Sequence, residues 1–345
     1  MKSYRKQVVV FIALMLLLNV GVILIVSYFD PLMCTSLING WNRITPVIDS
    51  RFQKTSRLLN DHSVYDALLI GSSRVEQFRQ EDFAPLKVFN YGLPSLYPDE
   101  YREYIDFFLR AHGATTKKIF IGLDFYGTNA GMYEHAKSPS FYIDTCSSVL
   151  YPLRSCMSWD SVKHVIRMLR GKRDQFCYDR ITLNKLTKRA TTAESADMVA
   201  KQIDTYRRNV YGGYHYNTGY GAQLRALRER YGKFGIVVFT TPETERLFQV
   251  LIEQGRVDDY IHWLNDIVEV FGEVYDLSLP GSFAATPENF LDAHHLYPER
   301  ASSITAIITG GTAPTPGVLG YHVTKANLRQ HLDLILDRAE QLRQL

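Results

Sequence analysis

The sequence predicts an α/β protein, a three-layer sandwich with a central, mostly parallel five-stranded sheet, an N-terminal transmembrane helix and an inserted subdomain. Short apolar segments alternate with longer segments of helical periodicity, which is the pattern of a parallel sheet covered by helices on both faces. An uncharged apolar run near the N-terminus is long enough to span a bilayer. A long stretch, residues 125–233, separates the third predicted strand from the fourth.

The N-terminal segment predicts a single membrane anchor. The uncharged run covers residues 8–29, and a helix needs about 20 such residues to cross a hydrocarbon core. Three basic residues precede it: Lys2, Arg5 and Lys6. By the positive-inside rule, residues 1–7 form a cytoplasmic tip and the chain beyond residue 29 lies outside that membrane. The alternative is a cleaved signal peptide, but the run is long for one and ends without a small-residue cleavage site.

Charge and cysteine content narrow the class of protein further. The chain has 39 Lys and Arg against 36 Asp and Glu, and three of the basic residues lie in the cytoplasmic tip. The exported part is therefore formally neutral, without the basic excess that nucleic acid binding requires. Of the four cysteines, Cys146 and Cys156 either pair in an oxidising compartment or are two of four separate core residues. No cysteine or histidine cluster has metal-ligand spacing, so no metal is predicted.

Five short apolar segments are the predicted strands. They cover residues 65–70, 87–91, 118–124, 235–240 and 274–277. Residues 30–64 precede them as a connector with a charged helix at 50–59, and residues 65–345 form the exported domain. Amphipathic segments predict helices at 101–111, 245–254 and 258–271, and a last helix over 324–342 with Thr324 as its N-cap.

The predicted insertion, at about residues 125–233, decorates the sheet. It contains helical patterns near 193–209 and 222–231 and a segment rich in tyrosine and glycine. The tyrosines are Tyr206, Tyr211, Tyr214, Tyr216 and Tyr220. Exposed tyrosine rings can stack on the apolar faces of sugars; the alternative is a loop packed onto the sheet.

A serine and a His/Asp pair are the candidate catalytic residues. Ser73 ends the sequence Gly71-Ser72-Ser73, in a turn directly after the first strand, where several α/β hydrolases hold a nucleophile. Serine needs an adjacent base that a carboxylate orients. Asp292 and His295 lie three residues apart after the last strand, so on one helical turn their side chains share a side. His294 is the alternative base, and Asp292 as a simple helix N-cap is the structural alternative.

An acyl-transfer site also needs donors for an oxyanion. The Ser73 N–H is one candidate, and the N–H of Gly92, after the second strand, is another because no side chain blocks its approach. Asp124, after the third strand, is an awkward neighbour because a carboxylate repels an oxyanion. Arg74 either binds a carboxylate or phosphate of a substrate or braces the loop by pairing with Asp124.

This order of motifs resembles the SGNH (GDSL-like) hydrolase superfamily. Its four blocks are Gly-Asp-Ser, a glycine, Gly-x-Asn-Asp and Asp-x-x-His. The matching segments here are Gly71-Ser72-Ser73, Gly92, Gly122-Leu123-Asp124-Phe125 and Asp292-Ala293-His294-His295. The resemblance implies a flavodoxin-like fold, with Ser73 as the nucleophile, His295 as the base and Asp292 as the orienting acid. Two positions depart from the pattern: Ser72 replaces an aspartate and Asp124 replaces the oxyanion asparagine.

The sequence Gly-Ser-Ser-Arg after an N-terminal anchor looks more like a membrane-tethered branch of that superfamily. Its members accompany membrane-bound O-acyltransferases of the MBOAT family in the acylation of exported polysaccharides or teichoic acids. The resemblance therefore implies a bacterial inner-membrane protein with a periplasmic serine O-acyltransferase domain. An acetyl group, an exported glycan as acceptor, an MBOAT-type partner and no cofactor are expected. A glycan esterase with the same residues and an inactive scaffold that binds glycan or a membrane partner are the alternatives.

Overall fold

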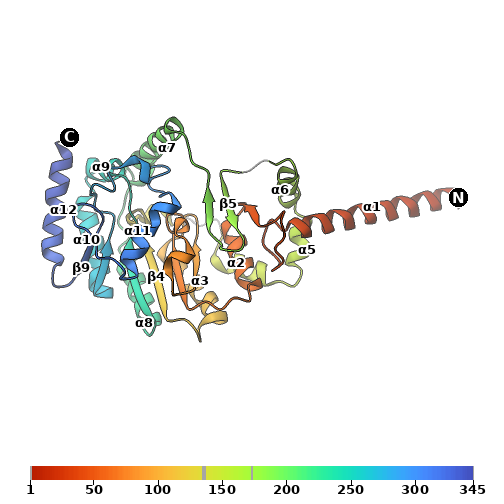
Figure 1. The fold of residues 1–345 in the computed structure, drawn as a ribbon, viewed down its shortest axis with the longest axis horizontal. Helices are drawn as coiled ribbons and strands as arrows, with labels where there is room; N and C mark the ends of the chain where they lie inside the picture. The colour runs from red at the N-terminus through yellow and green to blue at the C-terminus, as the bar shows by residue number, and fades with distance from the viewer. Residues whose placement is uncertain (1, 134–136, 172–173, 345) are drawn as a thin grey trace. The chain divides into compact units, whose positions relative to one another are not determined.

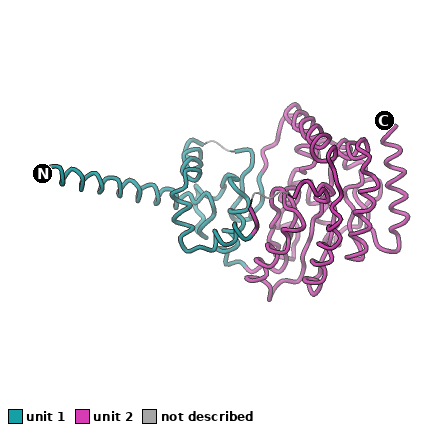
Figure 2. The backbone as a smooth tube through the Cα atoms, turned by 180° about the vertical axis from the view of Figure 1, so that it is seen from behind, with its two compact units in different colours: residues 1–63, 140–186 teal, residues 64–139, 187–345 magenta. Residues whose placement is uncertain are grey.

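The computed structural model describes residues 2–133, 137–171 and 174–344 of the chain. The backbone forms two compact units, residues 1–63 with 140–186 (unit 1) and residues 64–139 with 187–345 (unit 2), as Figure 2 shows. Residues 30–63 of the expected connector, residues 30–64, thus share unit 1 with part of the expected insertion. The rest of the insertion, residues 125–139 and 187–233, belongs to unit 2.

Unit 2 is built on a mostly parallel six-stranded sheet, in the order β3-β2-β4-β7-β8-β9. The strands are β2 (Ala67–Gly71), β3 (Val88–Gly92), β4 (Lys118–Leu123), β7 (Gly235–Thr240), β8 (Glu273–Asp276) and β9 (Tyr321–Thr324). Five strands run parallel, as predicted, but β9 pairs antiparallel with β8 at one edge. The prediction of five strands was wrong because β9 has a single buried side chain, Val323, and lacks the apolar run of a central strand.

Helices connect the strands of unit 2 (Figure 1). They are α3 (Pro98–His112), α7 (Thr192–Thr205), α8 (Tyr220–Tyr231), α9 (Glu245–Glu253), α10 (Val257–Phe271), α11 (Pro298–Ile308) and α12 (Leu328–Arg343). Short helical turns add η1 (Val75–Gln77), η2 (Gln80–Phe83), η3 (Phe125–Thr128), η4 (Ala130–Met132), η5 (Tyr206–Val210) and η6 (Pro287–Asn289). Thr324 is not the N-cap of the last helix: it ends β9, and its N–H donates to Asn327 Oδ1 at 2.7 Å, before α12 begins.

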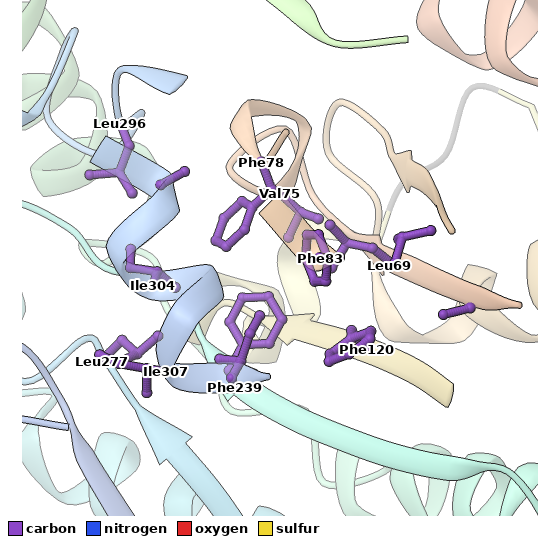
Figure 3. Packing of buried hydrophobic residues seen from close by; sticks show 14 of the residues in the cluster. Leu69, Val75, Phe78, Phe83, Phe120, Phe239, Leu277, Leu296, Ile304 and Ile307 are labelled. Carbon is purple, nitrogen blue, oxygen red and sulfur yellow. The ribbon is translucent and has the colours of Figure 1, made fainter. Parts of the chain in front are cut away.

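Apolar side chains cover both faces of this sheet. On one face, α11 and the turns after β2 pack on alternate strand residues, as Figure 3 shows for Leu69, Phe120, Phe239, Ile304 and Ile307. On the other face, α3 covers β3: the Tyr91 and Tyr104 rings lie 4.9 Å apart, and Phe89 stacks on Phe108 at 6.2 Å. Because both faces are buried, β2 and β3 are buried at every position, which explains why their sequences are almost entirely apolar.

Unit 1 combines the N-terminal helix α1 (Lys2–Phe29) with a small mixed fold. Its elements are β1 (Ile44–Pro46), α2 (Ser50–Asn60), α4 (Pro139–Ser147), α5 (Tyr151–Cys156), α6 (Trp159–Leu169), β5 (Phe176–Asp179) and β6 (Lys185–Thr187). The strands form a three-stranded sheet in the order β1-β5-β6. By length and composition α1 can cross a membrane from Tyr4 to Phe29, a property that signal sequences share.

The four cysteines are buried and free, so Cys146 and Cys156 do not pair in this structure. Cys34 and Cys146 lie in one apolar cluster, and Cys156 lies in another with Val26 and Phe29. Burial raises the pKa of the Cys34 thiol to about 12 and that of Cys146 to about 11. Thiols in such surroundings behave as small apolar core residues, the alternative that the sequence left open.

Candidate active site

Ser73 lies in the turn that follows β2, at the carboxyl edge of the sheet. β2 is flanked by β3 and β4, so the winding of the chain reverses there, and ligands of open α/β sheets bind at such a switch point. The turn is tight, because the Val75 N–H donates to the Ser72 carbonyl at 3.0 Å. Gly71 permits it: a Cβ at this position would lie 2.4 Å from Val75 Cγ2.

A chain of hydrogen bonds joins the three candidate catalytic residues. Ser73 Oγ lies 2.8 Å from His295 Nε2, and His295 Nδ1 lies 2.7 Å from Asp292 Oδ2. When Nδ1–H donates to the carboxylate, Nε2 is left to accept the Ser73 hydroxyl proton. The three side chains are thus arranged as a nucleophile, a base and an orienting acid can be.

Asp292 and His295 lie in an irregular turn, not in the helical turn that their spacing suggested. The turn closes between Phe290 and Leu296, which form an antiparallel bridge. Asp292 Oδ1 accepts the N–H of His294 at 3.0 Å and that of His295 at 2.8 Å. One carboxylate oxygen therefore folds the turn, while the other holds the imidazole.

These contacts also fix the charge of Asp292. Burial alone would raise the pKa of this carboxyl, but the facing His295, its hydrogen bond and the His294 N–H hold the pKa well below its usual range. Asp292 is consequently ionised near neutral pH. An ionised acceptor is what the orientation of the His295 ring requires.

Two neighbouring segments hold the turn from outside. In α7, Gln202 Oε1 accepts the Ala293 N–H at 2.7 Å and Ser195 Oγ donates to the Leu291 carbonyl at 2.9 Å. Thr244 Oγ1, before α9, donates to the Ala293 carbonyl at 2.9 Å. The part of the predicted insertion that folds as α7 therefore positions the His/Asp pair.

His294, the alternative base, is turned toward a different environment. Its ring lies 4.2 Å from that of His295 and 5.5 Å from that of Tyr206, and its buried Nδ1 has no hydrogen-bond partner in the described chain. Burial, with His295 and Arg74 nearby, lowers the pKa of His294 well below its ordinary value. A ring with so low a pKa binds a proton weakly, and the histidine that contacts Ser73 is His295.

The same turn is the group of described residues that could hold a metal ion. Ligand atoms of Asp292, His294 and His295 lie within 4.8 Å of one another. However, Asp292 Oδ2 and His295 Nδ1 already share a hydrogen bond and His295 Nε2 faces Ser73. Binding a metal would break those bonds, so the donor set fits proton transfer better than metal coordination.

Gly92 does not provide the oxyanion donor that the sequence suggested. Its N–H donates to Asn90 Oδ1 at 2.8 Å. The Asn90 side chain in turn donates to the carbonyls of Val75 and Phe78, at 3.0 and 2.9 Å. Gly92 thus serves close packing instead: a Cβ there would lie 2.7 Å from the Glu76 nitrogen. The Ser73 N–H donates to none of the described residues and is the remaining candidate.

Arg74 and Asp124 lie together, as the bracing alternative expects. Arg74 Nε lies 3.6 Å from Asp124 Oδ1, and Nη1 lies 3.1 Å from Glu243 Oε2. Nη2 donates to the Tyr206 hydroxyl at 3.1 Å, and Thr241 Oγ1 donates to Asp124. With only 4% of its side chain exposed, Arg74 is a buried cross-brace between the ends of β2, β4 and β7.

Burial and mutual charge shift the pKa values of Arg74, Tyr206 and Glu243 in this cluster. Burial raises the pKa of Glu243 to about 7 although Arg74 faces it. Burial likewise raises the pKa of the Tyr206 hydroxyl to about 12. For Arg74, burial lowers the pKa, but Tyr206, Asp124 and Glu243 together raise it well above its ordinary value. The guanidinium therefore stays charged, and Glu243 is the group that can change charge near neutral pH.

The tyrosines of the insertion do not form a sugar-stacking surface. Four of the five predicted rings are buried, namely Tyr206, Tyr211, Tyr214 and Tyr220, and the fifth, Tyr216, is half-buried. Their rings pack on Phe125 and on one another, which is the alternative of a loop packed on the sheet.

Sequence reasoning missed several supporting residues. Glu243 and Thr241 follow the fourth predicted strand, and the carboxyl ends of parallel strands meet at one edge, so their position could have indicated them. Asn90 lies inside an apolar strand, where a buried amide signals a local hydrogen-bond network. Gln202 carries no comparable signal, because α7 reads as an ordinary surface helix.

A cavity of about 430 Å³ adjoins the turn on the Asp292 side. Its walls come from α7, the start of α9 and residues 284–290, and include Asp292 and Thr244 but not Ser73.

No protein family model and no curated protein matches this chain. Among solved structures, it is similar to a Streptococcus pneumonia protein provisionally described as a platelet activating factor. The two share 13% identity and a TM-score of 0.36, over 74% of this chain and 89% of that one. Similarity at this level carries no argument about function.

Proposed function

We propose that this protein is a membrane-anchored serine O-acyltransferase of the SGNH type, which transfers an acetyl group to an exported glycan. The observation that carries the proposal is the hydrogen-bond chain from Ser73 through His295 to Asp292. The position of Ser73 at the switch point of a parallel sheet supports it.

In the proposed reaction, Ser73 Oγ attacks the carbonyl carbon of an acyl donor while His295 Nε2 takes the hydroxyl proton. The tetrahedral intermediate collapses, and His295 returns the proton to the departing alcohol or thiol. A glycan hydroxyl then attacks the acyl-enzyme and gives its proton to His295. The sugar ester forms as the bond from the acyl carbon to Ser73 Oγ breaks and His295 returns that proton to Oγ. Asp292 stays ionised and holds the imidazole throughout. The Ser73 N–H is the proposed oxyanion donor.

The proposed setting is the inner membrane of a bacterium, with α1 as the anchor and the catalytic domain in the periplasm. An acyl donor made in the cytoplasm must cross that membrane, so an MBOAT-type membrane acyltransferase is the proposed partner. The motif order and the anchor support this assignment through the family resemblance. No diffusible cofactor is required, because the acyl group passes from donor to serine to acceptor.

Covalent labelling tests the serine mechanism directly. The full-length protein in detergent is treated with a fluorophosphonate probe, beside Ser73→Ala and a control, Ser282→Ala, in an exposed loop of the same unit. We expect labelling of the wild type and the control and none of Ser73→Ala. Equal labelling of all three, or none of any, would overturn the serine mechanism and favour an inactive scaffold.

A second measurement separates transfer from hydrolysis, because an esterase would use the same residues. The protein is supplied with an activated acetyl ester, with and without an oligosaccharide acceptor, and acetyl-sugar and free acetate are both quantified. Transfer in excess over hydrolysis supports the acyltransferase. Acetate release that ignores the acceptor would make the protein an esterase.

A further inference from the structure

Two short helices of unit 1 expose an apolar surface. The loop before α5, both helices and the bend between them carry large apolar side chains that face outward: Val149, Leu150, Leu153, Met157, Trp159, Ile166 and Leu169. The exposed fraction reaches 94% for Val149 and 72% for Trp159. Clustered apolar exposure of this kind marks an interaction surface in a soluble protein or a contact with a membrane.

This surface lies beside the end of α1, because α5 and α6 pack on the last turns of that helix. Val26 and Phe29 are buried against Cys156 and Val165. Ser27 Oγ lies 3.1 Å from Cys156 Sγ. Beyond these contacts α1 stays exposed and apolar up to Ile25.

The depth of the contact follows from the length of α1. A helix rises about 1.5 Å per residue, so Val26 lies roughly 30 Å beyond Lys6, which is about the thickness of a hydrocarbon core. If Lys6 stands at the cytoplasmic face, Val26 stands at the opposite face. The helices that pack on Val26 and Phe29 are then at the outer boundary of the bilayer.

The composition of α5 and α6 matches that boundary. Exposed basic residues accompany the apolar ones, namely Arg154, Lys163, Arg167 and Arg170, whereas residues 151–170 hold a single acidic residue, Asp160. Trp159 begins α6, and Trp41 lies 5.9 Å from Phe29 at the end of α1. Tryptophan favours the headgroup level, and basic amphipathic helices bind anionic lipid surfaces.

We propose that α5 and α6 lie in the outer headgroup region of the membrane that α1 spans, with their apolar side chains among the acyl chains of anionic phospholipids. This inference rests on the membrane anchoring given in the proposed function. Unit 1 would then be held by two elements, a spanning helix and an interfacial pair of helices. The second contact fixes the rotation of α1, which a lone spanning helix leaves free.

Spin labels on the full-length protein test this proposal. Single cysteines replace Leu153, Leu169, Leu14 in α1 and Leu186 in β6, which is 41% exposed; the native cysteines are buried, and the parent protein gives the background. The labelled proteins are reconstituted into phosphatidylethanolamine–phosphatidylglycerol vesicles. Collision rates with oxygen, which enters lipid, and with a water-soluble nickel chelate report the depth of each label.

We expect the labels at 153 and 169 to favour oxygen at least several-fold over the Leu186→Cys control, with the Leu14→Cys label deepest. If the labels at 153 and 169 are exposed to water while the label at 14 is exposed to lipid, the interfacial position of α5 and α6 is wrong but the anchor stands. The apolar surface would then bind a protein partner. A water-exposed label at 14 would overturn the anchor itself. The two failures are therefore distinguishable.

Discussion

At the scale of single residues, Asp292 links the fold of the site to its chemistry. One oxygen accepts two backbone N–H groups and the other holds His295. A substitution that keeps the first function and removes the second should therefore spare the structure and harm the reaction. Asn can retain Oδ1 as the backbone acceptor but cannot supply a charged acceptor to the imidazole.

We expect Asp292→Asn to slow acylation of Ser73 by about 10³- to 10⁴-fold, as the loss of an orienting carboxylate does in serine proteases. The rate of fluorophosphonate labelling measures it, and circular dichroism and thermal unfolding serve as the control for folding. A loss of less than tenfold in a folded variant would contradict the role given to Asp292.

Glu243 gives a second residue-scale prediction, on pH. Its pKa is about 7 in the folded protein and 4.5 in the ordinary state, so the folded state binds the proton more tightly. Protonated Glu243 therefore favours the folded state at low pH. As the pH rises from 4.5 to 7, this contribution to the free energy of unfolding is lost, by about 3 kcal/mol at most. Glu243→Gln removes this titration and keeps an oxygen for Arg74.

The free energy of unfolding of unit 2 should therefore fall less between pH 5 and pH 8 in Glu243→Gln than in the wild type. Urea titrations read by hydrogen exchange of β4 peptides measure it. Identical pH slopes for the two proteins would show that Glu243 is ionised throughout, held by Arg74.

At the scale of elements, the central strands could be predicted because strands buried on both faces have apolar sequences. Most helices could be predicted from their amphipathic periodicity. The β9 strand could not, since Val323 is its one buried side chain. The candidate nucleophile and its His/Asp pair were predicted from a turn after the first strand and from a three-residue spacing, whereas the Asn90 contact that occupies the Gly92 N–H depends on tertiary packing. Likewise, no local sequence pattern distinguishes the buried tyrosines of the insertion from exposed ones.

A buried pair of side chains, His331 and Asp276, connects the C-terminal helix to the sheet. His331 in α12 lies 2.7 Å from Asp276 Oδ2 at the end of β8. Thr240 and Tyr260 donate to the other carboxylate oxygen, at 2.8 and 3.1 Å. Burial alone would raise the pKa of Asp276, but His331, the Thr240 hydroxyl and the Ser278 N–H lower it. Asp276 is thus a buried carboxylate that depends on His331.

We expect His331→Ala to destabilise unit 2 by about 3–5 kcal/mol, because it leaves a buried charge short of a partner. His322→Ala is the matched control: its histidine pairs with Glu273 at 3.0 Å on the surface, where such pairs are worth less than about 1 kcal/mol. Urea unfolding of the two variants measures the difference. Equal losses would mean that the buried pair does not hold α12.

At the scale of the whole molecule, the chain has two sets of contacts with separate cores. The Ser73–His295–Asp292 chain and the Arg74 cluster lie wholly in unit 2. The end of α1 is fixed wholly within unit 1, where Arg180 donates to the Asp30 carboxylate at 2.8 Å and to the Thr35 carbonyl at 2.8 Å. Arg180 is fully buried, and burial raises the pKa of Asp30 despite that partner. The proposed active site and the proposed membrane anchor are thus built on different residues.

Arg180→Leu should consequently loosen one unit and spare the other. The variant leaves Asp30 buried without its cation, a change that costs about 3–5 kcal/mol, and the loss falls on unit 1. Hydrogen exchange should rise in peptides of β1, β5 and the segment after α1, while β2 and β4 exchange as in the wild type and Ser73 is labelled at an unchanged rate. A matching rise in the hydrogen exchange of β2 and β4, or a slower labelling of Ser73, would show instead that the stabilities of the two units are coupled.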